Sequence, residues 1–358
     1  MNQFLWFIAG AIAAFITNLI TPPIYSWARK KLARRILRYQ SKRSNLIILG
    51  PNPSNQRMKI GSLELDFIVL QYARYSPDLI YTTYKDRAIS LNSDFKRMKD
   101  EFIQDLKKRQ RKGELGLPYN SAMYKLSSFN VGEREIVDGE EIPILKLNFL
   151  PTDYFTQIIT DLNVGNPTRE KYAKSVDLTI QPVPEFSSIL GVNFNIITSD
   201  GYLIVTQRSS EVNVNGGRYH TSVGENLLRP TDSDPKGAPD LFYCARRGIQ
   251  EELGLSVDAK DIEFTIFGVY PPWCQYKIIG WSKIKETKSE VLEIHSLAIP
   301  KDKWENNKLL FVPCNPKSIA KFLKETDRHN WYDIGIACLI FSLFQVGYSH
   351  KEISKAFL

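Results

Sequence analysis

The amino-acid sequence predicts an α/β (α+β) sandwich, with a mixed sheet and flanking helices, preceded by a single N-terminal transmembrane helix. Three observations support this prediction: an uncharged apolar segment opens the chain, strand-like and helix-like runs alternate from about residue 57, and a helical acidic motif lies near residue 250. At 358 residues the chain exceeds one typical domain. We expect four regions: a membrane anchor (1–28), a basic juxtamembrane helix with a linker (29–56), an α+β accessory region (57–180) and a main domain (181–358).

The first 28 residues carry no charged side chain and predict the membrane anchor. The run Phe4–Ile20 is almost wholly apolar, and its extension to Ile24 gives about 20 residues, enough for about 30 Å of hydrocarbon. The positive charges follow this run instead of preceding it, which disfavours a cleaved signal peptide. By the positive-inside rule, we expect the rest of the chain in the cytoplasm and the N-terminus outside.

The net charge of +8 comes from one short segment. Residues 29–43 hold eight basic side chains and no acidic one; without them, the 47 lysines and arginines fall to 39, equal to the 39 acidic residues. The basicity therefore indicates a membrane-flanking helix, and we expect no DNA or RNA binding. The four cysteines form no C-x-x-C pair and the four histidines no metal spacing, which argues against disulfides and structural zinc.

In the accessory region, the run 62–72 is a strand or a short helix, and its pattern does not decide between them. We expect a helix over 93–112, where apolar residues recur at intervals of three and four, and a hairpin of strands 123–131 and 142–150 around Asp138-Gly139. Pro151 opens a helix that runs to residue 162 with Thr152 as its N-cap. Residues 163–177 are polar and linker-like.

In the main domain, strands 191–198 and 202–207 form a hairpin around Ser199-Asp200-Gly201, followed by an Asn/Gly loop (213–217) and a strand at 219–223. After the acidic motif, we expect strands at 262–269, 276–284 and about 293–299, then a helix around 317–324. The apolar run 331–346 is too short to span a bilayer and carries Asp333, so it predicts a buried packing helix.

The segment Arg247–Leu255 reads R-G-I-Q-E-E-L-G-L. It resembles the helical part of the Nudix box, R-E-U-x-E-E-x-G-U with U aliphatic, at every specified position except Gly248, where the family has a glutamate. The residues that match are Arg247, Glu251, Glu252 and Gly254. The resemblance implies a Nudix-like fold for residues 181–358.

Nudix hydrolases hold Mg²⁺ with about three carboxylates, because hard divalent cations need several oxygen ligands. The motif offers two, Glu251 and Glu252. This leaves two alternatives: residual binding of a metal ion or a nucleotide phosphate without efficient turnover, and a merely solvated acidic face. The upstream half of the box also departs from the pattern. Gly224 is the better match for its glycine, and the stretch from there to the helix contains an inserted loop, residues 229–240.

A nucleotide site needs cations for phosphate groups and flat side chains for bases. Around the motif, the sequence offers such candidates: Arg208, Arg218, His220, Arg246, Arg247, Tyr270 and Trp273, with Lys236 and Tyr276 as further ones. Each has a structural alternative, since Arg247 can pair with Glu251 one helical turn later and the aromatic residues can anchor the core or loops. The sequence assigns no catalytic residue.

A damaged Nudix box behind one N-terminal membrane helix resembles the transmembrane Nudix-homology effectors of CBASS, bacterial anti-phage systems in which a nucleotidyltransferase makes a cyclic oligonucleotide. The resemblance implies a receptor in the bacterial inner membrane that binds a cyclic nucleotide, forms a ligand-induced homo-oligomer and disrupts the lipid bilayer. Several copies are needed because a single helix forms no polar pore. Small residues within Ala9–Ala14 allow close helix contact, although ordinary alanine content explains them equally well.

The alternative function is a membrane-tethered, Mg²⁺-dependent Nudix hydrolase of nucleoside diphosphate derivatives. It requires a third metal ligand near Glu251 and Glu252. Asp232, Asp234 and Asp240 in the inserted loop are the candidates.

Overall fold

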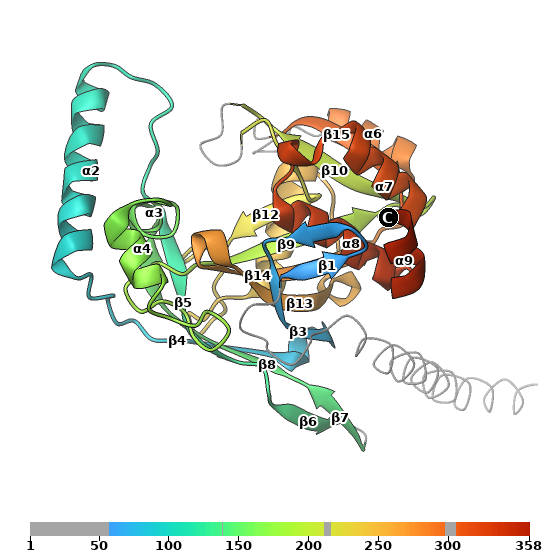
Figure 1. The fold of residues 1–358 in the computed structure, drawn as a ribbon, viewed down its shortest axis with the longest axis horizontal. Coiled ribbons are helices and arrows are strands. Elements are labelled where there is room, and N and C mark those ends of the chain that lie inside the picture. The colour runs from blue at the N-terminus through green and yellow to red at the C-terminus, as the bar shows by residue number, and fades with distance from the viewer. Residues whose placement is uncertain (1–56, 138, 211–215, 298–305) are drawn as a thin grey trace, which may run out of the picture. The chain divides into compact units, whose positions relative to one another are not determined.

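The computed structural model describes residues 57–358 apart from 138, 211–215 and 298–305 (Figure 1). The predicted anchor (1–28) and juxtamembrane segment (29–56) lie outside the described residues, as does most of the predicted Asn/Gly loop. Within the described part, no helix combines the length and the hydropathy that a membrane crossing needs.

An eight-stranded mixed sheet forms the centre of the described chain. Six strands lie side by side in the order β11-β10-β9-β14-β13-β3, while β12 pairs with β9 and β15 with β10. Strands β9 (Leu190–Ile197) and β14 (Gln275–Lys283) are parallel, and every other pair in this sheet is antiparallel. The remaining strands are β3 (Ile68–Tyr75), β10 (Tyr202–Arg208), β11 (Tyr219–His220), β12 (Val223–Asn226), β13 (Glu263–Tyr270) and β15 (Asn306–Pro313).

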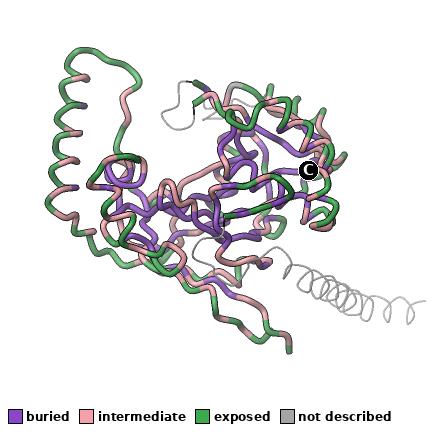
Figure 2. The backbone as a smooth tube through the Cα atoms, viewed as in Figure 1, coloured by how far each residue is buried: buried purple, intermediate pink, exposed green. Residues whose placement is uncertain are grey.

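Both faces of this sheet are covered, so β9 is buried at every position (Figure 2). Because side chains alternate along a strand, Val192 and Phe194 point to one face and join the core formed with helix α5 (Leu241–Gly248). On the opposite face, Asn195 Nδ2 donates to Ser342 Oγ of helix α8 (Asp333–Gln345) at 2.7 Å. The prediction of a buried helix in this apolar run is confirmed.

The accessory region contains a three-stranded sheet in the order β4-β8-β5, formed by β4 (Ile80–Tyr84), β8 (Leu145–Asp153) and β5 (Ala122–Asn130). Between β5 and β8 a hairpin of β6 (Arg134–Val137) and β7 (Glu140–Pro143) projects from the body (Figure 1). Helix α2 (Ser93–Arg111) confirms the predicted helix. The run left undecided is extended, as β2 (Leu63–Leu65), which pairs with β1 (Met58–Ile60), and as β3.

Strand β3 belongs to the main sheet, not to the accessory sheet, because it pairs with β13 from Phe264↔Tyr75 to Val269↔Ile68. The described residues, from 57 onward, belong to one compact unit. The region 57–180 therefore contributes an edge strand to the sheet of the region 181–358, and the boundary at residue 180 stays a prediction.

Three predicted details are wrong. The helix expected over residues 151–162 begins only at Tyr154 (α3, Tyr154–Ile159), and its N-cap is Asp153, whose carboxylate accepts from Thr156 N; Thr152 still belongs to β8. The linker-like stretch contains helix α4 (Pro167–Ala173) with Arg169 buried, because Asn166 caps it and Pro167 begins it. The run around 293–299 is helical, as α6 (Lys288–Leu297).

The C-terminal part adds two further helices, α7 (Pro316–Glu325), which was predicted, and α9 (His350–Ala356). Both lie on the side of the molecule where the chain ends (Figure 1). The predicted strands β9, β10, β13 and β14 are confirmed to within a few residues.

Candidate functional site

The acidic motif lies on α5 and on the π-helical turn that continues it, Ile249–Leu253. Asp240 precedes the helix, and its carboxylate accepts from Tyr243 N at 2.9 Å, which satisfies one of the free N–H groups of the first turn. Gly254 ends the helical segment with a φ of 74°, a left-handed conformation that favours glycine.

Arg247 is the centre of an ion-pair network. Its Nη1 lies 2.7 Å from Glu251 Oε2, its Nε lies 2.8 Å from Asp232 Oδ1, and its Nη2 lies 3.0 Å from Glu225 Oε2. Burial favours the neutral guanidinium, but the hydrogen bonds with Asp232 and the charges of Glu225 and Asp232 raise the pKa of Arg247 above its ordinary value. The predicted pairing with Glu251 is present, and two carboxylates that the motif does not contain join it.

Glu225 occupies the space beside Gly248, the one mismatch of the motif. A Cβ atom built on Gly248 would lie 2.4 Å from Glu225 Cγ and 2.7 Å from Val223 Cγ1. Val223 and Glu225 are two residues apart on β12, so their side chains point to the same face, toward α5. The Glu225 side chain, from the neighbouring strand, therefore fills the space beside this glycine.

Glu252 is 3% exposed and accepts hydrogen bonds from two neutral groups. Gly224 N donates to its Oε1 at 3.1 Å, and Asn306 Nδ2 of β15 donates to its Oε2 at 2.8 Å. Gly224 therefore serves the motif as a backbone donor from β12. The contribution of Asn306 was missed, because this residue lies far away in sequence and in a strand that was not predicted.

The three aspartates of the inserted loop have structural partners. Asp232 also accepts from Leu228 N at 2.8 Å, Asp234 accepts from Lys236 N and Ala238 N at 2.8 Å each, and Asp240 caps α5. Among the described residues, no three His, Cys, Asp or Glu side chains are arranged to hold a metal ion. The carboxylates around α5 thus point to a guanidinium and to N–H donors, and this arrangement does not fit an Mg²⁺ cage.

A cavity of about 260 Å³ opens beside Glu252. Its polar lining comes from Glu252, His295, Asn306 and Lys308, and its apolar lining includes Leu253, Leu292 and Leu309. Lys308 is exposed. It lies near the acidic motif in the structure, although no sequence pattern connects the two.

The predicted aromatic residues gather at a second place, where the β13–β14 connection meets the start of α8. The His220 and Tyr332 rings stack with centroids 5.5 Å apart at 8°, and Tyr332 also stacks on Trp273 at 5.1 Å and 23°. Tyr270 meets Trp273 and Tyr332 edge to face. Three of the predicted nucleotide-binding residues therefore lie together, joined by Tyr332, which the sequence did not single out.

Cationic side chains influence this aromatic cluster electrostatically. Arg208 and Arg218 lie on either side of the Asn/Gly loop, and Arg218 is exposed. Burial, followed by the charges of Arg208 and Lys277, lowers the pKa of His220 well below its ordinary value, so His220 is neutral at pH 7. Burial, with smaller contributions from Asp333 and Asp66, raises the pKa of Tyr270 to about 12, and the charge of Arg218 opposes this shift.

The remaining predicted residues belong elsewhere. Arg246 donates from Nε to Val257 O at 3.1 Å, and Tyr276 is fully buried in the core with its hydroxyl donating to Leu178 O. Lys236 lies in the turn that Asp234 organises. No hydrogen bond or ion pair described in the structure joins His220, Tyr270, Trp273 or Arg218 directly to Arg247, although the His220 ring lies beside Gly224, which donates to Glu252.

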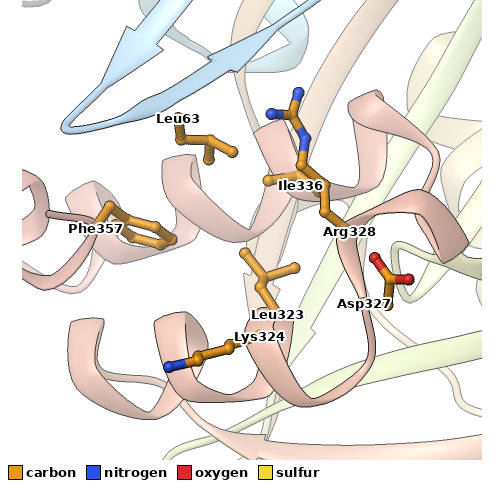
Figure 3. A pocket seen from close by; sticks show the side chains of 7 residues that line it. All are labelled: Leu63, Leu323, Lys324, Asp327, Arg328, Ile336 and Phe357. Atoms are coloured by element: carbon orange, nitrogen blue, oxygen red, sulfur yellow. The ribbon is translucent and has the colours of Figure 1, made fainter.

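A second hollow of about 260 Å³ contains none of the predicted residues (Figure 3). It lies between the β1–β2 hairpin and helices α7, α8 and α9, and its lining is Leu63, Leu323, Lys324, Asp327, Arg328, Ile336 and Phe357.

Neither a protein-family model nor a curated protein sequence matches this chain. Among solved structures, a Deinococcus radiodurans protein aligns at 14% identity over 42% of this chain and 80% of its own, with a TM-score of 0.31. The MutT protein of Methanosarcina mazei aligns at 14% identity over 45% of this chain and 96% of its own, with a TM-score of 0.29. A MutT/nudix family protein of Enterococcus faecalis aligns at 14% identity over 35% of this chain and 43% of its own, with a TM-score of 0.26. The chain is thus distantly similar in structure, over its C-terminal portion, to Nudix and MutT proteins.

Proposed function

We propose that the protein is a non-enzymatic receptor for a cyclic nucleotide, anchored in the bacterial inner membrane, and that it acts as an effector in anti-phage defence. Binding of the messenger by the described domain assembles several copies, and their N-terminal helices then disrupt the bilayer. The messenger comes from a functionally linked nucleotidyltransferase.

One observation carries the non-enzymatic part of this proposal. A hydrolase of the Nudix type needs carboxylate oxygens free to bind a divalent cation, whereas Arg247 engages Glu225, Asp232 and Glu251. The remaining carboxylate, Glu252, accepts from Gly224 N and Asn306 Nδ2. These carboxylates therefore already have hydrogen-bond donors as partners and do not converge on a common cation position, so efficient turnover is not expected.

The aromatic cluster carries the receptor part. Trp273 and Tyr270 are only partly buried and offer ring surface for stacking, which contributes about 1–3 kcal/mol per base. The exposed guanidinium of Arg218 lies close enough to influence Tyr270 and can pair with a phosphate. Effector action rests on the sequence: the uncharged first 28 residues and the basic segment behind them.

A hydrolase remains the competing function, and the cavity beside Glu252 is the observation that favours it. Lys308 and His295 line that cavity and could contact a phosphate group next to a carboxylate. The two functions predict different fates for the nucleotide: an intact ligand for the receptor and cleaved product for the hydrolase.

The test uses the full-length chain in detergent, with Mg²⁺ and a panel of cyclic dinucleotides, nucleotide sugars and dinucleoside polyphosphates. We expect calorimetry to detect binding of an intact cyclic nucleotide, and Arg218→Ala to weaken it by at least about fivefold, the loss of one phosphate contact. Arg111→Ala, which removes an exposed arginine at the end of α2, should leave the affinity unchanged.

In bacteria that also make the messenger, growth arrest should require residues 1–28. Rapid Mg²⁺-dependent cleavage of a phosphoanhydride that disappears in Glu252→Gln would overturn the proposal in favour of the hydrolase. Equal binding by Arg218→Ala and the unmodified chain would remove the aromatic cluster as the receptor site.

A further inference from the structure

Lys277 is a buried cation with an incomplete set of partners. Its residue is 5% exposed on β14, and the structure gives its ammonium one acceptor among the described residues, Gln275 Oε1 at 3.1 Å. An ammonium group has three donors. Two of them therefore have no acceptor among the described groups, although burial of such a charge without partners costs several kcal/mol.

The two other buried cations of this region are satisfied. The Lys125 ammonium donates to the carbonyl groups of Val183, Pro184 and Phe186. Arg169 donates to Thr160 O, Asp161 O and Pro272 O and pairs with Glu170. The fold thus supplies oxygen acceptors for buried cations elsewhere, and the shortage at Lys277 is local.

Acidic groups do not fill this shortage. Asp161 is the carboxylate that interacts electrostatically with Lys277, but it accepts from Ser188 N and Ile189 N and forms no ion pair with the lysine. Burial lowers the pKa of Lys277 to about 8, so the group remains largely protonated at pH 7. The side chain therefore carries its charge while it lacks a counter-charge at contact distance.

Among the described residues, three further buried polar atoms lack a hydrogen-bond partner: Gln275 Nε2 and Asn193 Oδ1 on the two strands that meet at Lys277, and the Tyr332 hydroxyl at the start of α8. Lys277 lies across Gly191 of the neighbouring strand, where a Cβ atom would come 2.5 Å from Nζ, and Asn193 follows on the same face of β9. His220 connects this group to Tyr332, because its ring lies beside Asn193 over Gly224 and stacks on Tyr332. All five side chains are at least nine-tenths buried: Lys277, Gln275, Asn193, Tyr332 and His220.

We propose that Lys277, Gln275 and Tyr332 form a binding site for a phosphoryl group on the face of the main sheet that α8 covers. A phosphoryl group provides three or more acceptor oxygens, which match the two unused ammonium donors, the Gln275 amide and the Tyr332 hydroxyl. The Asn193 amide can present either its oxygen or its nitrogen, since the two are related by a flip. Free phosphate and the phosphate of a nucleotide share this chemistry. The site stands apart from the proposed function, because it requires only an anion.

The test is thermal unfolding of the full-length chain in detergent, followed by tryptophan fluorescence, with inorganic phosphate added at constant ionic strength. We expect the midpoint to rise with phosphate, as mass action requires for a ligand that binds only the folded state. Lys277→Met should lose this response and, without phosphate, unfold at the same or a higher temperature, because an unpaired buried charge is removed. Lys283→Met, an exposed lysine on the same strand, should respond as the unmodified chain does.

Tyr332→Phe provides a second variant that keeps the ring stack and removes only the hydroxyl; its phosphate response should fall several-fold. The site would be overturned if phosphate did not raise the unfolding midpoint of the unmodified chain. It would also be overturned if phosphate raised the midpoints of Lys277→Met and Tyr332→Phe as much as that of the unmodified chain, and ordered water would then be the occupant. If Lys277→Met does not fold, Tyr332→Phe decides alone. Stabilisation by phosphate but by no cyclic nucleotide would support this site while contradicting the proposed function.

Discussion

At the scale of single residues, Gly248 and Glu225 act as a pair. The glycine leaves room for a carboxylate that reaches over from β12, and that carboxylate is held by Arg247. A glutamate side chain at position 248 would meet Glu225 and Val223. The packing against β12 therefore favours glycine at this position of the helix.

Gly248→Ala tests this pairing because two effects oppose each other. Helix propensity alone would stabilise the variant by about 1 kcal/mol. The added Cβ, however, would come within 2.7 Å of two side chains, and such overpacking costs about 1–3 kcal/mol. We expect a net decrease in the free energy of unfolding, measured with urea. Gly132→Ala is the control, since its Cβ would meet nothing closer than 3.8 Å; a stabilised Gly248→Ala would contradict the packing argument.

The sequence predicted part of this network. Arg247 and Glu251 are four residues apart on one helix, and local spacing is enough to pair them. Glu225 and Arg247 are 22 residues apart, with a turn and an inserted loop between them, so helical spacing carries no information about their contact. The same holds for Tyr332, which joins His220 to Trp273 from a distant part of the chain.

At the scale of elements, the inserted loop (229–240) and helix α5 stabilise each other. Asp240 at the end of the loop caps the helix, while Asp232 inside the loop is fully buried and pairs with Arg247 near the end of α5. The loop also reaches the accessory sheet, where Arg229 Nε donates to Met123 O at 3.1 Å. An insertion that departs from the family motif thus fixes the position of the motif helix.

Asp240→Ala should lower the free energy of unfolding by about 1 kcal/mol, the usual contribution of an N-cap carboxylate. The matched control is Asp258→Ala: Asp258 also precedes a helical turn but makes no side-chain cap hydrogen bond. Chemical denaturation of both variants gives the comparison. Equal losses in the two would show that the cap of α5 contributes nothing specific.

Elements with strong periodicity were predictable, and short ones were not. The spacing of apolar residues in 93–111 and the apolar run of α8 indicated helices that are present. Helix α6 was predicted as a strand, and strand β15 was not predicted, for the same reason. Short runs of apolar and polar residues fit both the helical and the strand periodicity, and burial against the sheet decides between the two structures.

At the scale of the whole molecule, β3 joins the accessory region to the main domain. The residues that it pairs with on β13 are 189 to 201 positions away in sequence, and β3 forms one edge of the eight-stranded sheet. Gly268 of β13 permits this contact, since a Cβ there would meet Phe67 at 2.4 Å. Local pattern could identify β3 as extended but could not name its partner, because long-range pairing depends on the fold of the entire sheet.

A fragment of residues 181–358 should therefore be less stable than a fragment of residues 57–358. Without β3, the hydrogen-bonding edge of β13 and the apolar side chains under it meet solvent, which favours aggregation. Size-exclusion chromatography and circular dichroism of the two fragments provide the measurement. A monomeric 181–358 fragment with a cooperative unfolding transition equal to that of the longer fragment would contradict the role of β3.

The position of β3 also has a mechanical meaning. The chain upstream of Met58 runs through the β1–β2 hairpin into β3, the outermost strand of the large sheet. Tension on that upstream chain would thus load the outermost strand before any other strand of this sheet, and the ladder between β3 and β13 would bear the force. A force applied through the chain before Met58 would therefore separate β3 from β13 before it disrupted any other strand pair of this sheet.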